Sequence, residues 1–212
     1  MIPLAIFGGT FDPVHIGHLR VAWEAAEALD AEVRMMPAHV PPHRLQPQAS
    51  AAHRLAMLQA ALAGQSRLAV DQRELSRHGP SYTVDTLREL RHEIGPQRPL
   101  LLLVGADAYA GLPTWHDWLE LYALAHLVVL TRPGHPVEWS GVLALETRAR
   151  QVGTAASLRE VPAGRVLELA VTPLEVSASH VRAEFAAGRE PRYLVPNAVL
   201  AYIRAHDLYG GA

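Results

Sequence analysis

Short apolar runs along the chain alternate with longer stretches in which apolar residues recur every three or four positions. Runs of strand length cover residues 2–7, 33–36, 68–70, 100–104, 127–130 and 166–171. Helical spacing covers residues 16–29, 51–62, 83–92, 115–125, 138–151, 177–187 and 197–206. The first of these stretches places five apolar residues on one helical face: Leu19, Ala22, Trp23, Ala26 and Leu29. The pattern predicts buried strands separated by helices.

Strands that alternate with helices over short links are typical of an α/β fold with a mostly parallel sheet. We predict a Rossmann-like, doubly wound sheet with helices on both faces and a small helical portion at about residues 177–212. No linker or repeat divides the 212 residues, so residues 1–212 are expected to form a single domain. Ligands of such sheets bind beyond the carboxyl ends of the strands, which points to the loops after Phe7, Met36, Val104 and Val171.

Composition narrows the possible chemistry. All 19 basic residues are arginines, and cysteine is absent. The chain therefore has no lysine nucleophile, thiol, disulfide or cysteine-ligated zinc, and an anion has to be held by arginine, histidine or backbone N–H groups. A net charge of −2 argues against a nucleic-acid partner. The apolar segments are too short for a signal peptide or a membrane span, so we expect a cytoplasmic protein without a membrane partner.

The loop after the first strand holds the strongest chemical signal, Gly-Gly-Thr-Phe-Asp-Pro-Val-His-Ile-Gly-His at residues 8–18. Gly8 and Gly9 lack Cβ atoms, which favours a turn and lets a phosphate approach the peptide N–H groups. The helix predicted from residue 16 directs its positive N-terminal end to the same place. His15 and His18 share a face of its first turn, where two imidazoles can donate hydrogen bonds to phosphate oxygens.

A second segment, residues 176–182, follows the last predicted long strand. Ser177 is placed to cap a helix N-terminus and to leave other N–H groups for an anion. Arg182 lies within about one and a half helical turns of that cap and can reach the same anion as a forked donor. An ordinary capped helix with a surface arginine is the other interpretation of this segment.

The first segment resembles the signature of the nucleotidyltransferase superfamily, His-x-Gly-His at the start of the first helix, and the second resembles its Ile-Ser-x-Thr/Ser-x-x-Arg motif. Over almost the whole chain, further segments resemble bacterial nicotinate-nucleotide adenylyltransferases in order and spacing, namely residues 40–44, 80–83, 85–87, 104–107, 113–115 and 194–196. The resemblance implies transfer of the adenylyl group of ATP to nicotinic acid mononucleotide in NAD biosynthesis, giving nicotinic acid adenine dinucleotide and pyrophosphate. It further implies in-line attack without a covalent enzyme intermediate, and Mg²⁺ that accompanies ATP.

The resemblance also implies roles for individual residues. His15 and His18 would contact the α-phosphate and the departing pyrophosphate, and with Arg182 they form the implied catalytic set. The other implied ATP-binding residues are Gly8, Gly9, Thr10, Phe11, Gly105, Asp107 and Ser177. The implied mononucleotide-binding residues are His39, His43, Tyr82, Thr83, Trp115 and His116, with Trp115 stacked on the pyridine ring. His39 and His116 depart from the family, which often has an asparagine and an aromatic residue there.

Other interpretations remain open from the residues alone. A same-fold adenylyltransferase could prefer nicotinamide mononucleotide, and a nucleotide-binding module could keep the fold without catalysis. A class I aminoacyl-tRNA synthetase shares His-x-Gly-His but normally adds a lysine-rich signature, which this chain lacks. Histidine pairs three or four positions apart, such as His15 with His18 and His39 with His43, also occur in zinc enzymes. No acidic or cysteine partner lies at a matching position, so we predict no metal site in the protein itself. Whether the chain forms a homo-oligomer is left open.

Overall fold

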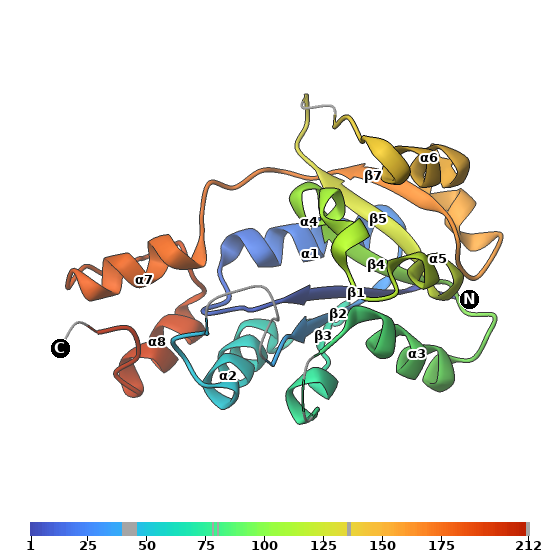
Figure 1. Ribbon diagram of the computed structural model, residues 1–212. Coiled ribbons are helices and arrows are strands. Elements are labelled where there is room, and N and C mark those ends of the chain that lie inside the picture. The colour runs from blue at the N-terminus through green and yellow to red at the C-terminus, as the bar shows by residue number, and fades with distance from the viewer. Residues whose placement is uncertain (40–45, 78, 80, 135–136, 211–212) are drawn as a thin grey trace.

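The computed structural model describes residues 1–39, 46–77, 79, 81–134 and 137–210 (Figure 1). Its strands form one seven-stranded parallel sheet in the order β3-β2-β1-β4-β5-β7-β6. They are β1 (Leu4–Gly9), β2 (Glu32–Pro37), β3 (Leu68–Val70), β4 (Leu100–Gly105), β5 (His126–Thr131), β6 (Gln151–Val152) and β7 (Val166–Ala170). The chain builds outward from β1 to β3 and then adds β4 on the other side of β1, so the predicted doubly wound α/β class is confirmed.

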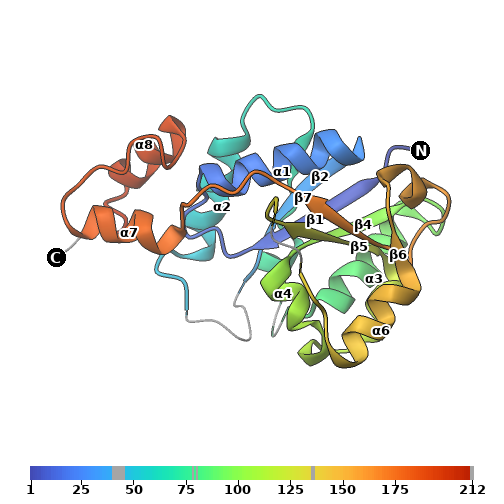
Figure 2. The same ribbon diagram turned by 90° about the horizontal axis from the view of Figure 1, so that it is seen from above.

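The helices cover both faces of the sheet. They are α1 (Ile16–Leu29), α2 (Ala51–Leu62), α3 (Thr83–Ile94), α4 (Ala106–Ala110), α5 (Leu121–Leu124), α6 (Gly141–Arg150), α7 (Ala178–Ala186) and α8 (Asn197–Ala205). Figure 2 shows α1 and α2 on one side of the sheet and α3, α4 and α6 on the other. Figure 1 shows α7 and α8 beyond the carboxyl end of β1, as the predicted small helical portion. Within the described ranges, none of the helices combines the length and hydropathy that crossing a membrane requires.

Side chains of the central strands alternate between two cores. Leu101 and Leu103 of β4 pack in the core that includes α1 and α2. Leu100, Leu102 and Val104 pack in the core that includes α3 and α4. All five are buried because helices cover both faces of a parallel sheet. This double burial explains why residues 100–104 form one unbroken apolar run in the sequence.

The prediction of one helix over residues 115–125 is wrong. Trp115 is extended, with ψ 147°, and Asp117 adopts a left-handed backbone, with φ 49°. A short 3-10 helix at Trp118–Glu120 and then α5 follow, so the apolar spacing serves to bury Leu121 and Tyr122 rather than to mark a long helix. The pattern also missed the shortest elements, α4, β6 and the 3-10 helices, because a few residues show no period. The other 3-10 helices are Arg73–Ser76, Leu112–Thr114 and Ala155–Arg159.

Candidate active site

The carboxyl end of β1 forms the base of the candidate site, and here the predicted glycine turn is wrong. Gly8 and Gly9 are extended and pair with Met36 and Pro37 of β2, so the turn begins only after them. A Cβ on Gly9 would lie 2.8 Å from the buried ring of Phe11, which itself has a left-handed backbone with φ 50°. No atom of the described residues lies within 4 Å of a Cβ position at Gly8, so none of them covers the peptide there.

The strand order reverses between β1 and β4, and this is where open parallel sheets bind ligands. Gly105 ends β4 and caps α4, and the exposed Asp107 lies in the first turn of that helix. A Cβ on Gly105 would likewise have no neighbour within 4 Å in the part of the chain that the structure describes. The structure therefore places Gly105 and Asp107 at the same edge of the sheet as Gly8 and Gly9.

His15 and His18 cap the N-terminus of α1 with their own rings. Nδ1 of His15 accepts the His18 N–H at 3.4 Å, and Nδ1 of His18 accepts the His15 N–H at 3.3 Å. The two rings stack with centroids 3.6 Å apart. Because each Nδ1 accepts a hydrogen bond from a backbone N–H, Nε2 carries the proton in the neutral form of each ring. The His15 side chain is 6% exposed, and burial lowers its pKa to about 4, so it is a neutral donor at pH 7.

Stability against unfolding is expected to fall as the pH is lowered through about 6.5, the ordinary pKa of a histidine in an unfolded chain. Below it the unfolded chain binds protons that His15 and the fully buried His126 do not bind in the folded protein, because burial lowers both folded pKa values. Each histidine contributes up to about 1.4 kcal/mol per pH unit to the slope of the free energy of unfolding against pH. Burial raises the pKa of Glu74, so Glu74 contributes a slope of the opposite sign, but it is one group against two. Urea unfolding between about pH 7.5 and 5.5 measures the slope; stability that stays level or rises on acidification would contradict the expectation.

The second sequence motif lies against this helix start. Ser177 caps α7 by accepting the His180 N–H at 3.1 Å, as predicted. Arg182 of α7 donates from Nη1 to the main-chain carbonyl of Asp12 at 2.7 Å. A Cβ on Gly17 would lie 2.9 Å from Val176, so the glycine allows the two segments to touch. The structure thus joins segments that are 170 positions apart in the sequence.

Four of the residues implied for the mononucleotide, Tyr82, Thr83, Trp115 and His116, lie on the α3 side of the sheet. Tyr82 precedes α3 and its ring faces that of His116, with centroids 4.5 Å apart. Tyr82 and Trp115 both pack, partly buried, against the core on this side, and Thr83 is the first residue of α3. His39 follows β2 and is partly buried, while His43 lies outside the described residues.

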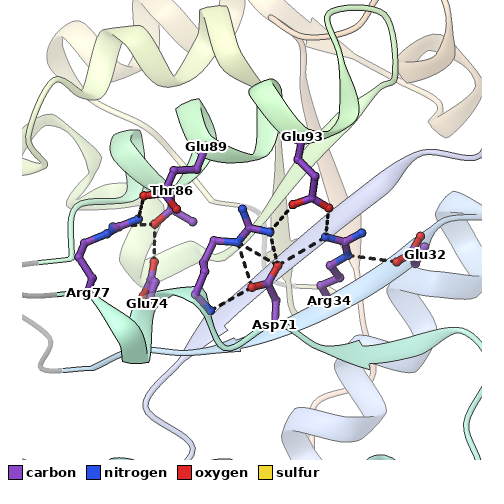
Figure 3. Close-up of polar contacts among 9 residues, drawn as sticks. Glu32, Arg34, Asp71, Glu74, Arg77, Thr86, Glu89 and Glu93 are labelled. Carbon is purple, nitrogen blue, oxygen red and sulfur yellow. Dashed lines mark hydrogen bonds and ion pairs between the residues drawn. The ribbon is translucent and has the colours of Figure 1, made fainter.

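An ion-pair network anchors the segment between β3 and α3 (Figure 3). Arg73 donates to Asp71 through Nε and Nη2 and to Glu93 of α3 at 2.6 Å. Arg34 of β2 donates to the same Glu93 at 2.8 Å. Burial alone would raise the pKa of Asp71, but the hydrogen bonds from Arg73 and the charge of Arg34 outweigh it and hold the pKa below its ordinary value. The network ties α3 to β2 and β3.

A second group of contacts holds the first turn of α3. The Thr86 hydroxyl donates to Glu74 at 2.8 Å, and Arg77 donates to Thr86 at 3.1 Å and to Glu89 at 2.6 Å (Figure 3). Glu74 and Arg77 lie in and just after the 3-10 helix Arg73–Ser76 that follows β3, and Thr86 and Glu89 lie in the first two turns of α3. Hydrogen bonds from the segment that follows β3 therefore hold the start of α3, which carries Thr83, in place.

Arg54 of α2 is a site residue that the sequence analysis missed. Its guanidinium donates to the carbonyls of Thr10 at 2.8 Å, Ala38 at 2.7 Å and His39 at 2.9 Å, and the residue is only 1% exposed. It joins the loop after β1 to the loop after β2. The sequence did hold a signal for the burial of Arg54: this arginine lies three positions before Met57, on the apolar face of the predicted helix.

Comparison with known proteins identifies relatives of this chain. A sequence model described as cytidylyltransferase-like matches residues 6–184. A protein from Marinobacter nauticus is 50% identical over 206 residues, covering 97% of this chain and 95% of its own length, and one from Pseudomonas aeruginosa is 51% identical over 208 residues, covering 97% and 96%. Both bear the name probable nicotinate-nucleotide adenylyltransferase.

A solved structure shows the same fold at much lower sequence identity. The nicotinic acid mononucleotide adenylyltransferase of Plasmodium falciparum, in a complex with NaAD, is 15% identical and has a TM-score of 0.71. The match covers 99% of this chain and 98% of that one. The fold, the family model and relatives of about half-identical sequence agree, and the chain belongs to the cytidylyltransferase-like family and, within it, to the nicotinate-nucleotide adenylyltransferases.

Proposed function

We propose that the protein transfers the adenylyl group of ATP to nicotinic acid mononucleotide, giving nicotinic acid adenine dinucleotide and pyrophosphate. The observation that carries the proposal is the meeting of two distant segments: the imidazoles that start α1, and Arg182, which donates to the loop just before them. Together they offer hydrogen-bond donors and a permanent cation. Such a set suits displacement at phosphorus by positioning and charge stabilisation.

In the proposed step, a 5′-phosphate oxygen of the mononucleotide attacks the α-phosphorus of ATP in line. The bond from that phosphorus to the bridging oxygen breaks, and pyrophosphate leaves with the electron pair. His15 and His18 donate from Nε2 to the α-phosphate and the departing pyrophosphate, while Arg182 and the α7 N–H groups beside Ser177 hold the β- and γ-phosphates. The remaining contacts to ATP come from Gly8, Gly9, Thr10, Phe11, Gly105 and Asp107.

Mg²⁺ belongs to the substrate in this proposal. It keeps several water ligands and binds nucleotide phosphates with at most one or two protein carboxylates. The exposed carboxylate of Asp107, at the ligand-binding edge of the sheet, fits a water-mediated contact of this kind.

The proposed mononucleotide side consists of Tyr82, Thr83, Trp115 and His116, with His39 and His43 from the loop after β2.

Trp115→Ala is expected to raise the KM for the mononucleotide about tenfold, since the pyridine ring loses an aromatic face, and to leave the KM for ATP within about twofold. Steady-state kinetics with each substrate varied in turn measures both constants. Trp118→Ala is the matched control, because Trp118 packs against the same core. Equal shifts of both constants in the Trp115 variant would indicate core packing alone.

Pyrophosphate release from ATP and Mg²⁺ with either nicotinic acid mononucleotide or nicotinamide mononucleotide tests the function. Faster turnover of the acid supports the proposal. Faster turnover of the amide would favour the same-fold alternative. ATP binding without pyrophosphate release from either substrate would identify a non-catalytic nucleotide-binding module. Because both substrates meet one edge of one sheet in this proposal, residues 1–212 act as a single nucleotidyltransferase domain.

A further inference from the structure

Asp12 lies where four segments of the chain meet. Its main-chain carbonyl accepts from Arg182 Nη1 at 2.7 Å. Its carboxylate accepts from the backbone N–H of Gln48 at 2.7 Å and of Ala49 at 3.1 Å, and from the hydroxyl of Tyr209 at 2.7 Å. The residue is 4% exposed. A carboxylate that is buried among three donors is held in one position, and its own carbonyl is held with it.

Tyr209 reaches Asp12 from the segment that follows α8, 197 positions away in the sequence. Its ring lies beside that of Phe185 of α7, with centroids 6.2 Å apart, and its backbone is left-handed with φ 65°. Burial, and then the hydrogen bond to Asp12, raise the pKa of the Tyr209 hydroxyl. The hydroxyl therefore stays protonated and acts as a donor to the carboxylate at neutral pH.

Arg182 depends on Asp12 for its position. Besides the bond to the Asp12 carbonyl, its Nη1 lies 3.9 Å from the Asp12 carboxylate, and its Nη2 donates to the Ser179 hydroxyl at 3.2 Å. Its Nε is buried and has no hydrogen-bond partner among the described residues. A buried charged donor without a partner is costly, so the site favours a further acceptor such as a phosphate oxygen.

A shift of Asp12 would act on one side of the site. Phe11 and Tyr209 belong to the core that includes α1 and α2. Tyr82 and Trp115 pack against the opposite core, which includes α3 and α4. The bond between Tyr209 and Asp12 is therefore coupled to the proposed triphosphate contacts rather than to Tyr82 and Trp115 of the proposed mononucleotide side.

We propose that Tyr209 and Asp12 form a positioning pair for ATP. The Tyr209 hydroxyl fixes the Asp12 carboxylate, and the Asp12 carbonyl fixes Arg182 beside the loop after β1. The segment after α8 thereby sets the affinity for the triphosphate. This inference rests on the proposed function for the identity of its substrate, and it adds a residue, Tyr209, that lies outside both sequence motifs.

Tyr209→Phe removes the hydroxyl and keeps the ring beside Phe185. We expect the dissociation constant for a non-hydrolysable ATP analogue, measured by titration calorimetry, to rise about tenfold, as for one lost hydrogen bond to a charged group. The KM for the mononucleotide is expected to stay within about twofold. Tyr202→Phe is the matched control, because that hydroxyl contacts Nδ1 of His53 at 3.0 Å and not the loop after β1. It should leave both constants unchanged.

Amide hydrogen exchange gives a second measurement that does not depend on turnover. In Tyr209→Phe the N–H groups of Gln48 and Ala49 should exchange faster than in Tyr202→Phe, because the carboxylate that accepts them loses one of its partners. Unchanged exchange, unchanged affinity for the analogue, or equal weakening of both substrates would overturn the inference. If the unaltered protein makes no dinucleotide but Tyr209→Phe still weakens analogue binding, the positioning pair stands and the proposed function fails.

Discussion

His18→Ala is expected to lower kcat by at least about 100-fold, the loss that follows removal of one donor to a transition state. Nδ1 of His18 already accepts the His15 N–H at 3.3 Å, so the neutral ring presents its proton on Nε2. In the proposed reaction that proton stabilises the negative charge that grows as pyrophosphate departs. Initial rates of pyrophosphate release at saturating ATP and mononucleotide measure the change.

His18→Gln separates this chemistry from folding. His18 is the third residue of α1 and forms a capping box with His15, and glutamine at this position can accept the same backbone N–H. We therefore expect the glutamine variant to keep the melting temperature and still to lose kcat as the alanine variant does. His92→Ala, at an exposed position of α3, should change neither quantity. Near-normal kcat in both His18 variants would remove this residue from the catalytic set.

Arg54→Met is expected to lower the free energy of unfolding by about 3–5 kcal/mol, as for other changes that strand buried polar groups. The methionine fills much of the same volume but leaves three carbonyls, those of Thr10, Ala38 and His39, without their donor. Burial lowers the pKa of Arg54, with only partial compensation from the charge of Asp12, so the guanidinium is retained at a real desolvation cost. Urea unfolding at neutral pH measures the loss.

The control for Arg54 is Arg67→Met, which removes an arginine whose side chain is 46% exposed. Its free energy of unfolding should stay within about 0.5 kcal/mol of the unaltered value. A loss below about 1 kcal/mol for Arg54→Met would mean that water replaces the guanidinium at the three carbonyls, and the loops after β1 and β2 would then not depend on it.

Local patterns were enough to predict most of the fold. The bounds of α1, α2 and β3 agree with the predicted ranges 16–29, 51–62 and 68–70, because apolar spacing in each reflects burial of one face or one short strand. Ser177 caps α7 as predicted, since capping involves residues only three positions apart. The prediction failed at residues 115–125, where the left-handed backbone of Asp117 interrupts an apolar pattern that suits a helix.

The candidate site was predictable only for residues that belong to a motif. Residues 8–18 and 176–182 carried a chemical signal in the sequence. For Arg54 and Tyr209, no signal in the sequence indicated which residues they contact. Arg54 donates to backbone carbonyls and Tyr209 to a carboxylate, and these groups belong to remote segments of the chain. The capping arrangement of His15 and His18 could likewise not be read from spacing, since other side-chain acceptors could have satisfied the same backbone N–H groups.

The sequence by itself determined the alternation of strands and helices, the absence of lysine and cysteine chemistry, and the two motifs at residues 8–18 and 176–182. Only the tertiary structure decided that β1 and β4 meet where the strand order reverses, that Arg182 reaches Asp12, and that Tyr209 closes on the same carboxylate. The reason is physical. Spacing reports on neighbours within one element, whereas contacts between residues 170 or 197 positions apart depend on how both cores pack around the sheet.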